Sequence, residues 1–202
     1  MLQGCRKLTG VPDGRLPITK LILEKILSVS RTTISCVFSR VRFQAMCSLA
    51  FYALLRVGEM TSSDNNLSLK SVVFQDNYMS LNFKTYKHSS GDGASLRINA
   101  LSSPDSCPMS LMQAYMGYRG SKASPLFLTT SGEAVPRQVF TSELKSALDF
   151  AGFDSKRYTS HSFRIGAASH MAETGASDAQ IRQAGRWSSN AFLSYIRSNH
   201  SK

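Results

Sequence analysis

The stretch His161-Ser-Phe-Arg-Ile-Gly-Ala-Ala168 places a histidine and an arginine three residues apart at the head of a predicted helix. Residues at this spacing lie on one face of a helix, so both side chains point the same way. The free N–H groups and the dipole of the helix favour an anion at this end. The stretch therefore indicates a candidate anion site, although an ordinary helix start is the alternative, because this spacing is common by chance.

The chain around this stretch is long enough for a core and strongly basic. Its 202 residues suit one main domain with a short appendage, and 42% of them are hydrophobic. There are 24 Lys and Arg against 13 Asp and Glu, which gives a formal net charge of +11. Such a surplus favours a polyanionic partner, because each neutralised phosphate releases a condensed counterion. A basic surface without a specific partner is the alternative.

The cysteines and the apolar runs exclude several classes of protein. Four cysteines without a Cys-x-x-Cys pair stand beside only four histidines, so we expect no metal site. Unpaired cysteines suit a reducing compartment. The first ten residues lack the apolar core of a signal peptide, and the longest apolar run, over 45–55, is too short and interrupted to cross a bilayer. We expect an intracellular, soluble protein.

Most of the chain is predicted to be helical. Residues 1–16 are basic and aperiodic and predict a tail or linker. Pro17 is predicted to open a short helix, and a longer one over about 36–55 is apolar almost all round, as in a buried central helix. Glycines mark the ends of the later helices, and a capping box at Ser177 marks the start of one of them. These are predicted over about 108–118, 137–150, 162–173, 177–185 and 190–197.

One β region interrupts the helices. A first strand is predicted over 69–74, followed by a turn at Asp76-Asn77. Hydrophobic and polar residues alternate over 79–83, and the turn Gly91-Asp-Gly93 leads to a third strand around 96–98. The predicted fold class is mainly α with a small three-stranded antiparallel sheet.

A second candidate stretch is Leu54-Leu-Arg-Val-Gly-Glu-Met60, at the predicted end of the buried helix. Arg56 and Glu59 would share a helical face, so that the carboxylate could hold the guanidinium rigid. The alternative is an ordinary salt bridge at a helix end.

Two further stretches lie near the C-terminal end of the sequence. Gly185-Arg-Trp-Ser188 holds the only tryptophan, in a predicted turn between helices, where an indole that caps the core is the alternative. Tyr195-Ile-Arg197 places a tyrosine beside a basic residue on the predicted last helix. The alternative there is an amphipathic tyrosine used for packing.

Taken together, these stretches resemble the catalytic domain of the tyrosine recombinase (phage integrase) family over about residues 36–197. The order is an arginine, a lysine on a β-hairpin, His-x-x-Arg, a tryptophan, and a tyrosine eight residues later. The stretches at 161–168, 185–187 and 195–197 look closest to recombinases of eukaryotic mobile elements, the DIRS-like and Crypton kinds. The resemblance implies the recombinase catalytic-core fold, a nuclear location, and recombination or integration of DNA without a metal, cofactor or ATP.

The resemblance implies roles for the charged and nucleophilic residues. Tyr195 would attack the scissile phosphate and form a 3′-phosphotyrosine. Arg56 and Arg164 would bind the non-bridging oxygens, because guanidinium groups match their geometry. Glu59 would orient these arginines without contacting the phosphate itself.

The remaining implied roles concern protons and a hydrogen bond to the phosphate. His161 would donate to the phosphate or help take the phenolic proton. Trp187 stands where many relatives carry a histidine, and its indole N–H would donate to the phosphate. A hairpin lysine would protonate the leaving 5′ oxygen. Lys84 and Lys87 compete for this role, and strand parity and nearness to the turn favour Lys87.

The resemblance also predicts the organisation and the partners of the chain. Residues 1–35 are expected to be a tail, linker and short helix that remain from a link to a missing core-binding domain, and residues 36–202 to be the catalytic domain. The expected partner is double-stranded DNA, with a possible homo-oligomer on it, and neither a membrane nor a small-molecule substrate. The alternatives are a non-catalytic DNA-binding derivative of such a recombinase, a type IB topoisomerase, and a helical module that binds acidic proteins.

Overall fold

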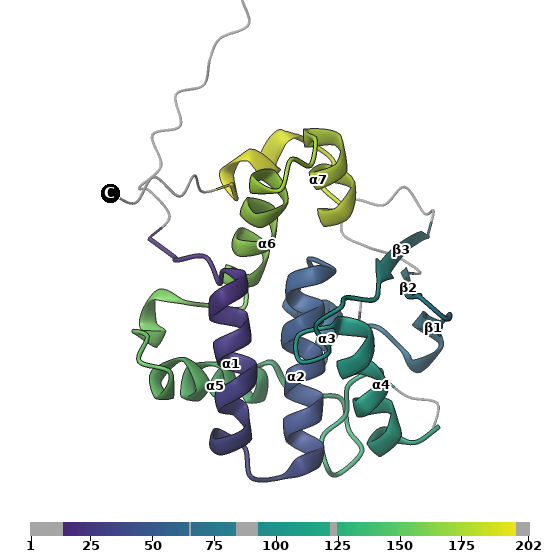
Figure 1. Ribbon diagram of the computed structural model, residues 1–202. Coiled ribbons are helices and arrows are strands. Elements are labelled where there is room, and N and C mark those ends of the chain that lie inside the picture. Colours follow the sequence, from purple (N-terminus) through teal and green to yellow (C-terminus); the bar gives the residue numbers. More distant parts are fainter. Residues whose placement is uncertain (1–13, 65, 84–92, 122–124, 197–202) are drawn as a thin grey trace, which may run out of the picture.

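The computed structural model describes residues 14–64, 66–83, 93–121 and 125–196 (Figure 1). Helices dominate, and one antiparallel sheet lies at their edge, which confirms the predicted class. In chain order the elements are α1 (Lys20–Thr33), α2 (Val37–Tyr52), α3 (Val57–Met60), η1 (Leu69–Ser71), β1 (Val72–Phe74), β2 (Tyr78–Phe83), β3 (Ala94–Asn99), α4 (Pro108–Arg119), α5 (Arg137–Phe150), η2 (Ser155–Arg157), α6 (Ser162–Glu173), α7 (Asp178–Gly185) and η3 (Asn190–Ser194), where η denotes a 3-10 helix.

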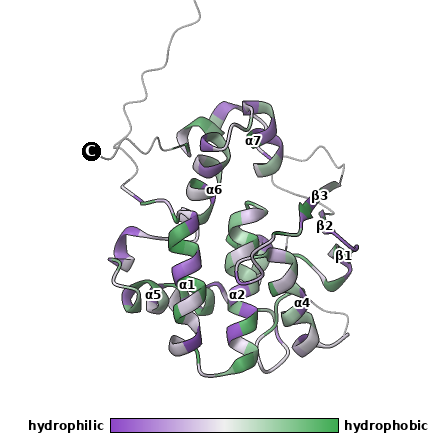
Figure 2. Ribbon diagram, in the orientation of Figure 1, coloured by the Kyte–Doolittle hydropathy of each residue, from purple (hydrophilic) through white to green (hydrophobic). Residues whose placement is uncertain are grey.

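Helix α2 forms the centre of the molecule. It contacts α1, α4 and α6, and its residues from Arg42 to Phe51 are almost all buried, as a helix that is apolar nearly all round requires. The first helix, α1, has 14 residues and begins at Thr19, whose Oγ1 accepts from the N–H of Ile22 at 3.3 Å. Along α1, hydrophobic and hydrophilic residues alternate, as expected for a helix that buries one face (Figure 2). In the described ranges, no helix is long and apolar enough to span a bilayer.

The predicted end of the central helix was wrong by three residues. Helix α2 stops at Tyr52, and Leu54 adopts a left-handed backbone conformation with φ 46°. The chain then turns into the four-residue helix α3, whose N-cap is Arg56. Arg56 and Glu59 therefore start a new short helix and do not share the last turn of the central one.

The sheet has the strand order β1-β2-β3, and its register places Val72 opposite Leu81 and Met79 opposite Ile98. Met79, Leu81 and Phe83 are buried, which confirms the alternation read from the sequence. The first strand is shorter than predicted, because residues 69–71 form the 3-10 helix η1. Its Ser68 N–H donates to the hydroxyl of Ser71 at 3.2 Å, which favours a turn over an extended chain.

The second half of the fold follows the predicted boundaries until its last element. Helices α4, α5 and α6 end within two residues of the predicted positions, and Ser177 forms the expected capping box of α7 with Gln180. The predicted last α-helix over 190–197 is instead the 3-10 helix η3, which ends at Ser194.

The segment before α1 lies tightly against α6. The N–H of Leu16 donates to the carbonyl of Arg157, and that of Ile18 to the carbonyl of Ser162, at 2.9 and 3.0 Å. A Cβ on Gly166 would stand 1.8 Å from the Ile18 carbonyl oxygen, so only glycine permits this approach. Leu16, which we predicted to be tail, is thus bonded to η2, directly before the helix that carries Arg164.

Candidate active site

The structure brings six of the predicted site residues together and leaves two outside its described ranges. The six come from three places: the turn into α3, the start of α6, and the segment from the end of α7 through η3. They are Arg56, Glu59, His161, Arg164, Trp187 and Tyr195. The two lysine candidates, Lys84 and Lys87, lie outside the described residues.

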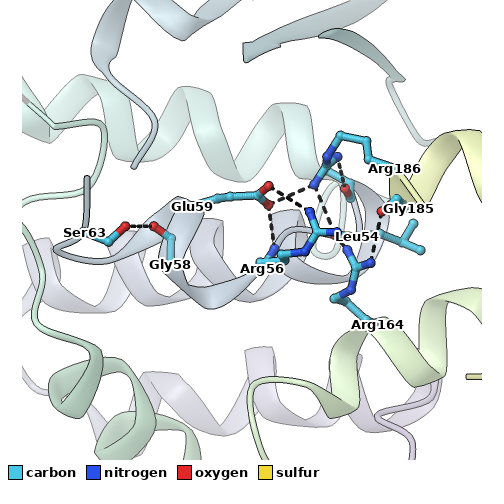
Figure 3. A network of polar contacts seen from close by, with 9 residues as sticks. Leu54, Arg56, Gly58, Glu59, Ser63, Arg164, Gly185 and Arg186 are labelled. Carbon is cyan, nitrogen blue, oxygen red and sulfur yellow. Dashed lines mark hydrogen bonds and ion pairs between the residues drawn. The ribbon is translucent and has the colours of Figure 1, made fainter. Parts of the chain in front are cut away.

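Arg164 is the buried centre of this group. Its Nη1 donates to the carbonyl of Leu54, and its Nη2 donates to the carbonyl of Gly185 at 3.0 Å (Figure 3). Burial lowers the pKa of Arg164 to about 10, and the positive charges of Arg56 and Arg186 act in the same direction. The guanidinium is still a cation at neutral pH, and two backbone carbonyls from different parts of the chain fix its plane.

Arg56 and Glu59 form a reciprocal cap at the start of α3. The Arg56 N–H donates to Oε2 of Glu59 at 2.6 Å, and Nη1 of Arg56 lies 3.5 Å from Oε1. The Glu59 side chain is 7% exposed and that of Arg56 is 27% exposed. The buried carboxylate therefore anchors a guanidinium that still reaches solvent, where an anion could meet it.

Three aromatic rings meet next to Arg164. The Tyr195 ring lies 4.7 Å from the His161 ring and 5.0 Å from the Trp187 ring, measured between centroids. Tyr195 follows η3 directly, and its N–H donates to the carbonyl of Phe192 at 2.9 Å. His161 is the N-cap residue of α6, as the sequence predicted, and both it and Tyr195 are half-buried.

Trp187 contacts the cationic cluster through the face of its ring. The carbon of the Arg164 guanidinium lies 4.4 Å from the Trp187 ring centroid and 5.7 Å from that of Tyr195. An aromatic face attracts a guanidinium, so the tryptophan and the tyrosine both stabilise the position of Arg164. Trp187 is half-buried in the turn after α7, where the sequence placed it.

Arg186 belongs to the same cluster and was missed by the sequence analysis. Its Nη2 lies 2.9 Å from Oε2 of Glu59, and both side chains are buried (Figure 3). Its place between Gly185 and Trp187, in a stretch already identified as a candidate, is the signal that could have indicated it.

The arrangement is suited to binding an oxyanion. Arg56 and Arg186 contact the carboxylate of Glu59, Arg164 lies within range of its charge, and a histidine and a tyrosine stand beside them. Guanidinium groups bind tetrahedral oxyanions through paired N–H donors, and a nearby phenol is a possible nucleophile. In the described ranges, no group of three or more His, Cys, Asp and Glu side chains is placed to hold a metal ion.

Comparison with known proteins gives the family to which this chain belongs. The chain belongs to the phage integrase family, whose model matches residues 18–201. A search of the curated proteins gives no match.

Several solved recombinase structures share the fold. The XerA recombinase is 20% identical with a TM-score of 0.70, and the alignment covers 92% of this chain and 61% of XerA. The XerH recombinase in a post-cleavage complex with its palindromic difH substrate is 16% identical with a TM-score of 0.72, covering 92% and 50%. A lambda integrase dimer bound to a COC′ core site is 15% identical with a TM-score of 0.65, covering 96% and 51%. The fold is that of the tyrosine recombinase catalytic core, and the chain spans half to about three fifths of these relatives.

Proposed function

We propose that this chain cleaves and rejoins DNA strands, with Tyr195 as the nucleophile. The observation that carries the proposal is that the Tyr195 ring packs against His161 and lies 5.7 Å from the Arg164 guanidinium within one chain. A nucleophile, a base and a phosphate-binding cation thus occupy one site. The fold and the family are those of DNA breaking-rejoining enzymes, which supports the same conclusion.

The first half of the reaction is an exchange of one phosphodiester bond for another. The Tyr195 oxygen attacks the scissile phosphorus and forms a 3′-phosphotyrosine, while the bond to the 5′ oxygen breaks. His161 takes the phenolic proton or donates to the phosphate. A lysine of the segment after β2, for which we favour Lys87 over Lys84, gives a proton to the leaving oxygen.

The second half reverses the first, with a 5′-hydroxyl as the nucleophile. No ATP is required, because the phosphotyrosine retains the energy of the original phosphodiester. Arg56 and Arg164 supply the positive charge that the non-bridging oxygens need in the transition state, so the proposed reaction requires no metal ion. Trp187 holds Arg164 through its ring face, and its indole N–H could also donate to the phosphate.

The proposed partner is double-stranded DNA. The net charge of +11 favours a polyanion, and the XerH and lambda integrase relatives were solved on DNA substrates. The lambda integrase relative is a dimer, which supports a homo-oligomer of this chain on DNA. One structural relative is the Tn1549 transposon integrase. Together with the sequence resemblance, it supports an origin in a mobile element, for which we propose the DIRS-like and Crypton kinds and action in the nucleus.

A nicked suicide duplex tests the proposal. In such a substrate, cleavage releases a short fragment, so the phosphotyrosine cannot be resealed and the adduct accumulates. We expect a covalent protein–DNA adduct that forms in EDTA and without nucleotide, with a free 5′-hydroxyl on the released strand. Tyr195→Phe removes one oxygen and keeps the ring, so DNA binding should persist while the adduct disappears.

Tyr158→Phe is the matched control for the nucleophile. Tyr158 is buried against Phe153, three residues before His161, and its ring faces a different neighbour from that of Tyr195. Its adduct yield should equal that of the unchanged chain. An adduct that persists in Tyr195→Phe would overturn the assignment. DNA binding without any adduct in the unchanged chain would instead favour a non-catalytic DNA-binding protein.

A further inference from the structure

Arg186 has a backbone conformation that glycine usually adopts. It ends α7 with φ 54° and ψ 47°, and the N–H groups of Arg186 and Trp187 donate to the carbonyls of Gln183 and Arg182. Helices commonly end with glycine in this left-handed conformation, because a side chain there crowds the backbone. The glycine of this turn, Gly185, comes one residue earlier, where a Cβ would stand 1.7 Å from the Trp187 ring. A strained arginine at this position calls for a role of its side chain.

The Arg186 side chain turns inward and contacts three parts of the chain. It is 5% exposed, and its Nη2 lies 2.9 Å from Oε2 of Glu59. The same guanidinium donates to the carbonyls of Ala53 and Leu54, at 3.4 Å each. Its carbon lies 4.3 Å from the ring centroid of Phe83, the last residue of β2.

The contact with Glu59 leaves the charge of Arg56 available. Oε2 of Glu59 accepts from the Arg56 backbone N–H at 2.6 Å and from Arg186, while the Arg56 guanidinium is 3.5 Å from Oε1. Arg186 therefore balances the carboxylate from the buried side. Without it, Glu59 would be buried with Arg56 as its remaining ionic partner among the described residues, and that guanidinium would be drawn inward, away from an approaching phosphate.

The contact with Leu54 ties Arg186 to the second phosphate-binding arginine. The Leu54 carbonyl accepts from Nη1 of Arg164 and from Nη2 of Arg186, so both guanidinium groups are fixed by one oxygen (Figure 3). Leu54 itself has a positive φ, an uncommon conformation for a residue with a branched side chain. Through Phe83, the same arginine also holds the end of β2, directly before the segment that carries both lysine candidates.

We infer that Arg186 is a positioning residue of the proposed reaction: it neutralises Glu59 and fixes the Leu54 carbonyl, so that Arg56 and Arg164 keep their place and their charge. The inference rests on the proposed function. Three guanidinium groups and one carboxylate leave two positive charges, which match the two negative charges of a phosphodiester attacked by a phenolate. Loss of Arg186 would leave one positive charge.

The test is the single-turnover rate of adduct formation on the suicide duplex at saturating DNA. Arg186→Met should slow the reaction by about 10–100-fold, the range typical of residues that orient a catalytic group. Arg182→Met removes the same charge from an exposed position of α7, four residues before Arg186, and should leave the rate unchanged. Arg186→Gly suits the left-handed backbone, so it provides a folded variant that lacks the side chain.

A rescue experiment separates positioning from a general need for the side chain in folding. If Arg186 acts by balancing Glu59, removing that carboxylate should restore part of the lost rate. The double variant Glu59→Gln/Arg186→Met should therefore form adduct several-fold faster than Arg186→Met alone, because glutamine still accepts the Arg56 N–H. A role in folding alone predicts the opposite, since two buried partners are then lost.

The outcomes distinguish this inference from the proposed function. If Arg186→Met and Arg186→Gly both react at the rate of the unchanged chain while Tyr195→Phe is inactive, the inference is overturned and the proposed function stands. A double variant slower than Arg186→Met also overturns it. If the unchanged chain forms no adduct that depends on Tyr195, the proposed function fails and the inference fails with it.

Discussion

Two arginine–glutamate pairs are buried in the described part of the chain, and they are built differently. Arg186 and Glu59 join the turn after α7 to α3, with side chains 5% and 7% exposed. Arg42 and Glu143 join α2 to α5, with side chains 2% and 16% exposed. Both pairs remove two charges from water, which is unfavourable unless the remaining donors and acceptors are satisfied.

The difference lies in how many donors surround each carboxylate. Glu59 accepts from a backbone N–H and from two guanidinium groups. Glu143 accepts from Arg42, but its Oε2 and the Nε of Arg42 have no hydrogen-bond partner among the described residues. Burial raises the pKa of Glu143 to about 7, although Arg42 opposes the shift. The comparison teaches that the carboxylate in the candidate site is held by several donors, while Glu143 depends, among the described residues, on Arg42 alone for its charged form.

The largest expected effect comes from breaking the pair that lies outside the site. Arg42→Met leaves Glu143 buried without its cation, and we expect the free energy of unfolding at pH 8 to fall by about 3–5 kcal/mol. Urea denaturation followed by circular dichroism measures the change. The rate of adduct formation by the folded variant should be unaffected, since the hydrogen bonds of Arg42 within the described ranges go to Leu128 and Glu143, outside the site.

Arg31→Met is the control for this loss of charge. Arg31 pairs with Asp105 at 3.2 Å, but both side chains are largely exposed, so little stability should be lost. An equal loss of stability in Arg31→Met and Arg42→Met would contradict the comparison, because burial would then be irrelevant.

The next largest effect concerns the arginine that is fixed by two carbonyls. Arg164→Lys keeps the charge but replaces the two nitrogens that donate to Leu54 and Gly185 with a single one, so the planar two-sided contact is lost. We expect the single-turnover rate at saturating DNA to fall by about 100-fold, as for the loss of one preorganised donor. Arg182→Lys, on an exposed face, is the control and should cleave normally. Equal rates for Arg164→Lys and the unchanged chain would show that charge alone matters here.

The smallest effect is a dependence of stability on pH. The pKa of Glu143 is raised from 4.5 to about 7 in the folded protein, so its protonated form is favoured by folding. The stability that it contributes is complete below about pH 4.5 and is lost as the pH rises through 7. Glu143→Gln should remove this dependence, by about 2 kcal/mol after allowance for partial solvent access. If the two proteins lose stability in parallel between pH 5 and 8, the carboxyl is charged in the fold.

Much of the fold could be predicted from local patterns. The alternation over 79–83 fixed which side of the sheet is buried, and Ser177 with Gln180 marked the start of α7. Such features depend on residues a few positions apart, so they are visible in the sequence. The 3-10 helices at 69–71 and 190–194 were missed, because short turns differ from strands and α-helices by a few hydrogen bonds.

The candidate site shows where local patterns stop. Arg56 and Glu59 were identified, but on the wrong helix. Helix α2 ends before them, and the Leu54 carbonyl at this end accepts from two arginines more than 100 residues away, which local patterns cannot show. Arg186 was missed for a similar reason. Its partner Glu59 is 127 positions distant, and its conformation depends on the Trp187 ring covering Gly185. Neither the pairing of Arg186 with Glu59 nor the packing of Trp187 on Gly185 produces a repeating pattern of residue types that could be recognised in the sequence.

The close approach of the N-terminal segment to α6 has a mechanical consequence. The two backbone hydrogen bonds from Leu16 and Ile18 end on Arg157 and Ser162, which flank the turn that presents His161. Because Gly166 has no side chain, the Ile18 backbone packs directly on α6, with no space for a Cβ between them. A displacement of residues 16–18 would disturb both hydrogen bonds, which lie on either side of this turn. Residues 14–18 are thus joined by two backbone hydrogen bonds to the two sides of the turn that presents His161.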